Sequence, residues 1–186
     1  MDHAIPAERM TADEFERWLD DRPDGGRFEL AGGKVVAMAP ERSIHAMLKG
    51  AAYVQLLTAS RHLECQVFPD GMAVRVDDAT QREPDAALRL GPRLGRDDTV
   101  YADPLVIVEV LSPSTAEIDL ADKVRDYGRI ETLAHYLVVN PTSRIVMHHR
   151  KDGEGFFTTI LPGGLLRLDP PGIDLDLDAI LSEVDR

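Results

Sequence analysis

Short runs of apolar and β-branched residues, separated by polar turns, account for most of the hydrophobic pattern of this chain and predict β-strands. The predicted strands are residues 27–31, 34–39, 63–68, 72–77, 84–90, 105–111, 135–140, 143–150 and 155–161. Apolar residues at helical spacing predict three helices, at residues 11–20, 43–60 and 119–130. Residues 77–81 are expected to form a turn and residues 91–99 a polar loop. This mixture predicts an α/β (α+β) fold with one central mixed sheet flanked by helices.

The helix predicted at residues 43–60 is apolar on nearly all sides. A helix of this kind is either buried in its own domain or shared with a partner subunit. Both possibilities stay open from the sequence, and the second leads us to expect a homodimer.

Glu109 lies inside the most apolar of the predicted strands, in the sequence LVIVEVLSPST. Its neighbours on both sides are apolar, as expected for a strand that is covered on both faces. Burial of an ionised carboxylate there costs several kcal/mol unless the group is paired or bound to a metal ion. The pattern therefore predicts a cationic partner for Glu109.

Two further acids lie in apolar strands. Asp85 stands directly before a short apolar run in REPDAAL, and Glu29 stands between two apolar residues in RFEL. If those two apolar residues face the core, Glu29 faces the other side of its strand. For each acid the alternative is a solvated position at a strand edge, and that alternative is strongest for Glu29.

A lysine falls on the buried face of the helix predicted after the Glu109 strand. Leu120, Val124 and Tyr127 recur at the spacing of a face that packs on a sheet, and Lys123 falls on the same face. The opposite side carries most of the charged residues: Asp119, Asp122, Arg125, Asp126 and Arg129. A pair between Lys123 and Glu109 is expected, and a lysine that extends past the helix edge to solvent is the alternative.

Several carboxylates with a lysine suit the metal-assisted hydrolysis of a phosphodiester. Two or three carboxylates hold one or two Mg²⁺ ions, which prefer hard oxygen ligands. The metal activates a water and offsets charge on the phosphoryl group, while a lysine orients the nucleophile or stabilises the transition state. We therefore expect Mg²⁺ as the cofactor, with Mn²⁺ as a substitute.

These residues resemble the PD-(D/E)XK nuclease superfamily, which has the restriction-endonuclease-like fold. More closely, five stretches are similar, in order, to a bacterial family of "putative restriction endonucleases" (Uma2-type). They are FELAGGKVVAM, SIHAMLKGAAYVQLL, EPDAAL, LVIVEVLSPSTAEIDLADKVRDYG and HYLVVNPTSRIV. The resemblance extends over about residues 10–180 of the single domain that we expect at residues 1–186.

The resemblance implies a DNA endonuclease in which Asp85 and Glu109 are metal ligands and Glu29 is a third acid. The superfamily's lysine normally stands two residues after the second acid, where this chain has Leu111. The resemblance places that lysine at Lys123 of the next helix, in agreement with the helical spacing.

Lesser roles are implied for three other positions. The backbone carbonyl of Val110 would be a further metal ligand, and Tyr127 would line the site. His45 matches a frequent histidine of the family, and a histidine that only begins the helix is the alternative.

The negative net charge of the chain argues against DNA as the substrate. The net charge is −12 and the sequence pI is about 4.8, so no basic surface is evident. A local basic groove would have to come from Arg42, Lys49, Arg61, Arg75, Arg82, Arg89, Arg93 and Arg96. The alternative function is a catalytically inactive, homodimeric interaction module that keeps the nuclease fold.

A serine hydrolase site and a histidine metal site fit the sequence less well. Ser112 and Ser114 lie in SPST, which lacks the G-x-S-x-G elbow and predicts a turn that leads to a helix cap. His148 and His149 are neighbours in a strand, so their side chains point to opposite faces and do not easily share a metal ion.

Composition sets the remaining expectations. Hydrophobic residues make up 44% and charged residues 29% of the chain, which is typical of a globular protein. No apolar run approaches the roughly 20 residues that cross a bilayer, and MDHAIPAERM lacks the apolar segment of a signal peptide. Cys65 is the only cysteine, which excludes an intrachain disulfide. We expect a cytoplasmic protein with no membrane partner.

Overall fold

A six-stranded mixed sheet forms the centre of the protein, whose computed structural model describes residues 5–22, 25–111, 116–153 and 155–185. The strand order is β11-β10-β9-β8-β6-β3. The strands are β3 (Cys65–Pro69), β6 (Ala86–Leu90), β8 (Val106–Val110), β9 (His135–Asn140), β10 (Ile145–Asp152) and β11 (Gly155–Leu161). Strands β8 and β9 are parallel and are joined through α3 (Ala116–Gly128), whereas the other neighbouring pairs are antiparallel.

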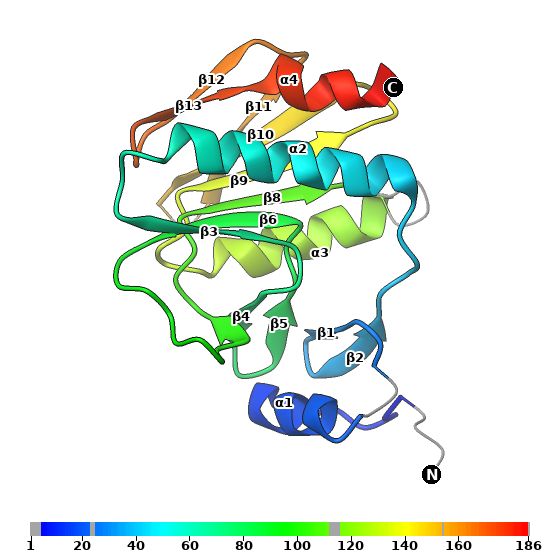
Figure 1. Cartoon of the computed structure of the whole chain (residues 1–186). Coiled ribbons are helices and arrows are strands. Elements are labelled where there is room, and N and C mark those ends of the chain that lie inside the picture. The colour runs from blue at the N-terminus through cyan, green and yellow to red at the C-terminus, as the bar shows by residue number, and fades with distance from the viewer. Residues whose placement is uncertain (1–4, 23–24, 112–115, 154, 186) are drawn as a thin grey trace.

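Helices cover both faces of this sheet. Helix α2 (Ser43–Ala59) lies along one face and α3 along the other (Figure 1). Alternation in β8 explains the two apolar cores, because Val106, Val108 and Val110 pack with α2, whereas Ile107 packs with Tyr127 of α3. Glu109 follows the same alternation as Ile107, so it lies on the face that α3 covers.

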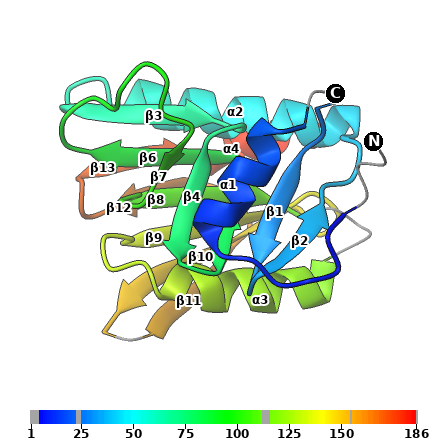
Figure 2. The same ribbon diagram turned by 90° about the horizontal axis from the view of Figure 1, so that it is seen from below.

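A second, five-stranded sheet has the order β2-β1-β5-β4-β7. Its strands are β1 (Phe28–Ala31), β2 (Lys34–Ala37), β4 (Ala73–Asp77), β5 (Thr80–Arg82) and β7 (Val100–Tyr101). Helix α1 (Ala12–Asp20) lies across this sheet (Figure 2), where Phe15 packs against Leu30 and Val35. The predicted capping box is confirmed, because Thr11 and Glu14 exchange both of its hydrogen bonds.

The C-terminal part of the chain packs along α2. A two-stranded hairpin, β12 (Leu165–Leu168) and β13 (Ile173–Asp176), leads into α4 (Leu177–Leu181) and the 3₁₀ turn η1 (Ser182–Asp185). Buried residues of these elements extend the core on the α2 side of the central sheet.

The predicted α+β fold with a mixed sheet and flanking helices is confirmed, but the prediction of one sheet was wrong. The short strands β5, β7, β12 and β13 were not predicted. Strand β5 has the sequence TQR, for which the local pattern predicts a turn and its flank, yet all three residues are buried. Polar residues can form a buried strand when other chain segments supply their partners, and the local pattern cannot show this. The predicted turn at Ser112 and Ser114 lies outside the described residues.

In the part of the chain that the structure describes, we find no helix with the length and apolar character that a membrane span requires.

Candidate active site

Glu109 is a buried acid on β8 whose two oxygens receive different donors from α3. Lys123 Nζ donates to Oε2 at 2.9 Å, and the Tyr127 hydroxyl donates to Oε1 at 2.7 Å. The side chain of Lys123 is only 12% exposed, so the alternative of a lysine extended to solvent is wrong. The pairing predicted from the helical spacing is thus confirmed.

Burial raises the pKa of Glu109 from its ordinary value of 4.5 to about 7. The charge of Lys123 opposes this rise, whereas the nearby charges of Asp85 and Glu29 add to it. The Tyr127 hydrogen bond also opposes the rise. The donors at Glu109 therefore do not fully compensate for burial of its negative charge.

Asp85 lies directly before β6, the antiparallel neighbour of β8. The register pairs Ala86 with Val108, and its continuation by one residue sets Asp85 opposite Glu109. Such cross-strand neighbours have Cβ atoms about 4.5–5.5 Å apart. Asp85 Oδ2 accepts a hydrogen bond of 2.6 Å from the backbone N–H of Val110, which fixes the carboxylate at the end of β8.

Lys49 of α2 contacts Asp85 from another side. Its Nζ lies 2.8 Å from Asp85 Oδ1, and also 2.8 Å from Asp70 Oδ2 and Glu41 Oε1. These carboxylates outweigh the effect of burial and raise the pKa of Lys49. Our prediction included Lys49 only among the residues of a basic groove. Its contact with Asp85 was not predicted, because it depends on how α2 lies against the strands.

Glu29 of β1 is also buried, so a solvated strand-edge position is wrong for it. Its Oε2 accepts from Arg82 Nη1 at 2.9 Å, and its Oε1 accepts from the backbone N–H of Glu83 at 3.0 Å. Lys123 Nζ lies 3.7 Å from Oε1. Burial alone would raise the pKa of Glu29, but the charges of Lys123 and Arg82 and these hydrogen bonds lower it.

Arg82 joins Glu29 to Asp126 of α3. The guanidinium donates to Asp126 Oδ2 from Nε at 3.0 Å and from Nη2 at 2.6 Å. The expectation that Asp126 lies on the solvent side of its helix was wrong, because Arg82 reaches it from β5. Arg82 and Asp126 are therefore the structural support of this site that sequence reasoning missed.

His45 connects the start of α2 to the end of β8. Its Nε2 lies 2.5 Å from the carbonyl oxygen of Val110 and 3.9 Å from Asp85 Oδ2, while its Nδ1 lies 3.0 Å from Glu41. The structure therefore brings His45 and the Val110 carbonyl, both expected near the site, next to Asp85.

Half of the eight residues expected to form a basic groove are paired with acids within the protein. Arg75 pairs with Asp13, Arg89 with Asp103, and Arg82 and Lys49 with the acids described above. Four others are exposed, namely Arg42, Arg61, Arg93 and Arg96.

The donors at the ends of β6 and β8 suit a hard divalent ion. Within the described ranges, no group of three or more His, Cys, Asp or Glu residues is arranged to hold a metal. Asp85 accepts from the N–H of Val110 and, by the register, lies opposite Glu109, so two carboxylates and the carbonyl of Val110 come from neighbouring positions at the ends of β6 and β8. Mg²⁺ is commonly held through one or two carboxylates and keeps several waters, so this oxygen donor set fits it.

The fold is shared with a solved structure described as "a putative nuclease belonging to DUF820" from Anabaena variabilis. The TM-score is 0.76 at 15% sequence identity, over 94% of this chain and 99% of that one. This similarity confirms the predicted α+β fold.

The sequence similarity is more specific. The family model Uma2, described as "Putative restriction endonuclease", matches residues 12–178, and the chain belongs to this family. An uncharacterized protein of Synechocystis sp. (strain PCC 6803) is 25% identical over 184 residues, which cover 95% of this chain and 94% of that protein.

Proposed function

We propose that the protein is a Mg²⁺-dependent endonuclease that hydrolyses phosphodiester bonds of DNA, with Mn²⁺ as a substitute ion. The contact of Lys123 with Glu109 at 2.9 Å, beside Asp85 on the neighbouring strand, carries this proposal. A buried lysine next to two carboxylates on adjacent strands is the combination that metal-assisted phosphoryl chemistry uses. Membership of the Uma2 family supports the same activity.

Asp85, Glu109 and the carbonyl of Val110 would hold the ion, which would activate water and offset charge on the phosphate. Lys123 orients the attacking water and offsets negative charge that develops on the phosphoryl oxygens. Tyr127 fixes the carboxylate of Glu109 by its hydrogen bond of 2.7 Å. His45 fixes the Val110 carbonyl, and Glu29 acts as a positioning residue for Lys123.

Cleavage of supercoiled plasmid, linear duplex and single-stranded DNA tests this proposal. Each substrate is incubated with Mg²⁺, with Mn²⁺ and with EDTA. We expect metal-dependent cleavage by the wild type and a loss of about 10²- to 10³-fold in rate for Lys123→Ala, because a preorganised positive group is removed. The cleavage rate of Asp85→Ala should fall by at least the same factor.

The matched controls are Lys34→Ala and Asp174→Ala, because both residues are exposed. Both variants should cleave DNA at the wild-type rate. Equal rates for wild type, Asp85→Ala and Lys123→Ala would contradict the site. The alternative of an inactive interaction module is favoured by the net charge of −12. Absence of cleavage on every substrate and with both ions would support that alternative.

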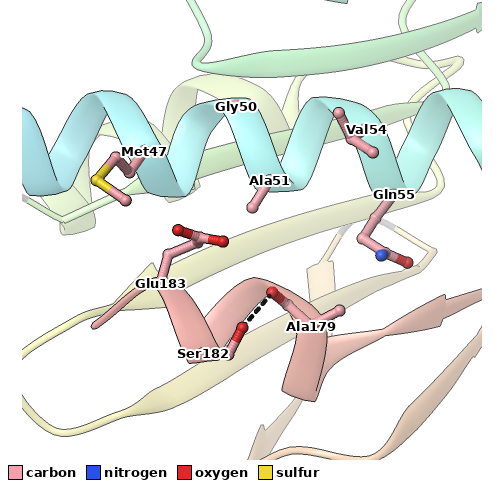
Figure 3. Close-up of a pocket in the computed structure, with 8 residues that line it drawn as sticks. All are labelled: Met47, Gly50, Ala51, Val54, Gln55, Ala179, Ser182 and Glu183. Atoms are coloured by element: carbon pink, nitrogen blue, oxygen red, sulfur yellow. Dashed lines mark hydrogen bonds between the residues drawn. The ribbon is translucent and has the colours of Figure 1, made fainter. Parts of the chain in front are cut away.

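We also propose that the protein is a homodimer formed through the outer face of α2. Met47, Val54 and Leu57 on this helix are 40%, 52% and 37% exposed, which is high for large apolar side chains. Beside them a shallow groove runs between α2 and the C-terminal helices (Figure 3). Met47, Ala51 and Val54 line one side of it, and Ala179 and Ser182 line the other.

Val54→Glu should convert the dimer to a monomer in size-exclusion chromatography with light scattering, because it places a charge in the apolar contact. Val36→Glu is the matched control, since Val36 is 45% exposed but lies on the five-stranded sheet. A wild-type protein that is monomeric at all concentrations would contradict the dimer.

A further inference from the structure

Lys49 is a buried lysine in an unusual position. Glu109 already has Lys123 as its cationic partner, so Lys49 is not needed to neutralise Glu109. Its Nζ lies at the centre of three carboxylates, those of Glu41, Asp70 and Asp85, at 2.8 Å from each. These acids come from three separate segments: Glu41 lies in the connection before α2, Asp70 directly follows β3, and Asp85 directly precedes β6. Lys49 itself is only 8% exposed.

The surrounding charges explain why an ammonium belongs there. Three carboxylates that converge on one point repel one another unless a cation lies between them. Arg27 compensates part of the charge, because it pairs with Asp70 at 2.9 Å, but it does not contact Asp85. Lys49 is thus the cation that directly contacts Oδ1 of the proposed metal ligand.

We propose that the Lys49 ammonium competes with the divalent ion for Asp85, so that Lys49 must release Asp85 Oδ1 when the metal enters. This inference rests on the proposed function. Asp85 Oδ2 already accepts the N–H of Val110, so Oδ1 is the oxygen whose contact can be exchanged. Lys49 keeps Glu41 and Asp70 after the release and is not left as an unpaired buried charge.

A purely structural role for Lys49 leads to a different expectation. In that case Lys49 would only attach α2 to the segments that carry Glu41 and Asp70, and its removal would lower stability without strengthening metal binding. Competition instead requires that loss of the positive charge increase the affinity for metal. Metal affinity, measured without DNA, therefore separates the two roles.

Mn²⁺ binding is measured by electron paramagnetic resonance of the free ion and by calorimetry. The proteins are wild type, Lys49→Met, Lys49→Arg, Asp85→Asn and the double variant Lys49→Met/Asp85→Asn. Lys49→Met should bind Mn²⁺ roughly tenfold or more tightly than wild type, because a positive charge close to the ion is removed. Lys49→Arg keeps the charge and should remain within about threefold of wild type.

Asp85→Asn should weaken binding in both backgrounds and abolish the gain from Lys49→Met. The exposed lysine variant Lys34→Met has the same change of net charge and should leave the affinity unchanged.

The outcomes distinguish this inference from the proposed function. If Asp85→Asn weakens binding but Lys49→Met binds Mn²⁺ as wild type does, the competition is overturned and the metal site stands. If Asp85→Asn changes nothing in either background, the ion does not bind at Asp85, and the proposed metal site fails first.

Should Lys49→Met not fold, the wild-type protein gives the answer. The ammonium resonance of Lys49, assigned with Lys49→Arg, is followed in a nuclear magnetic resonance titration with diamagnetic Mg²⁺. Competition predicts a large shift or broadening of this resonance as Mg²⁺ saturates the protein. An unchanged resonance at saturation would overturn the inference.

Discussion

Glu29 and Glu109 are both buried glutamates, they lie on different sheets, and Lys123 approaches both of them. Glu29 on β1 accepts from the guanidinium of Arg82 and from a backbone N–H, and Lys123 lies 3.7 Å away. Glu109 on β8 is in contact with Lys123 at 2.9 Å and accepts from the neutral hydroxyl of Tyr127. The pKa of Glu29 is lowered, whereas that of Glu109 is raised to about 7.

The opposite pKa shifts distinguish the two glutamates. The surroundings of Glu29 supply enough positive charge for its carboxylate, whereas those of Glu109 do not. The protein itself stabilises the negative charge of Glu29, so this residue needs no further cation. The negative charge of Glu109 is stabilised only in part, and an additional cation would complete it. This contrast agrees with the proposal that Glu109 binds the metal ion and that Glu29 has a positioning role.

The largest expected effect comes from the group that stabilises Glu29. Arg82→Met should lower the free energy of unfolding by about 3–5 kcal/mol, because it removes the buried cation that contacts the buried carboxylates of both Glu29 and Asp126. Urea denaturation at pH 7 measures this loss. Arg167→Met removes an exposed pair with Asp174 and should cost no more than about 1 kcal/mol. Equal losses in the two variants would show that the Arg82 pairs are not important for stability.

A smaller loss is expected for Glu29→Gln, about 1–3 kcal/mol at pH 7, because Arg82 and the N–H of Glu83 lose a charged acceptor. The pKa of Glu29 is lowered on folding, so its ionisation stabilises the protein above about pH 4.5, the ordinary value. This contribution is lost as the pH falls through the lowered pKa. The difference between wild type and variant should therefore shrink on acidification, and a difference that grew would contradict the assignment.

An effect of opposite sign is expected for Glu109→Gln in EDTA. Because folding raises the pKa of Glu109, the folded state binds more protons between pH 4.5 and about 7, and wild-type stability falls as the pH rises through this range. The neutral variant avoids this loss. We expect its Tm to exceed that of wild type at pH 8 by about 2–4 °C per kcal/mol gained, with no gain at pH 5.

Differential scanning calorimetry at the two pH values measures this change. A variant that is less stable than wild type at pH 8 would mean that Lys123 and Tyr127 fully compensate the charge of Glu109. In that case Glu109 would resemble Glu29, and the comparison between them would no longer support a metal site.

Much of the candidate site could be predicted because it depends on local periodicity. A period of two along β8 separates Glu109 from the valines that pack on α2, and a period near four in α3 aligns Lys123 with Tyr127. The same reasoning failed for Asp126. Helical spacing correctly separates it from Leu120, but it cannot show that Arg82 covers that side of the helix.

The sequence by itself determined the α+β class, the family, the position of the acids in apolar strands and the face of α3 that carries Lys123. These follow from side-chain periodicity and from motifs within single segments. Only the tertiary structure decided that β5 is a buried polar strand, that Arg82 joins two acids and that Lys49 contacts Asp85. Each of these contacts joins segments that are distant in sequence, and its free energy depends on burial and on the distance between charges.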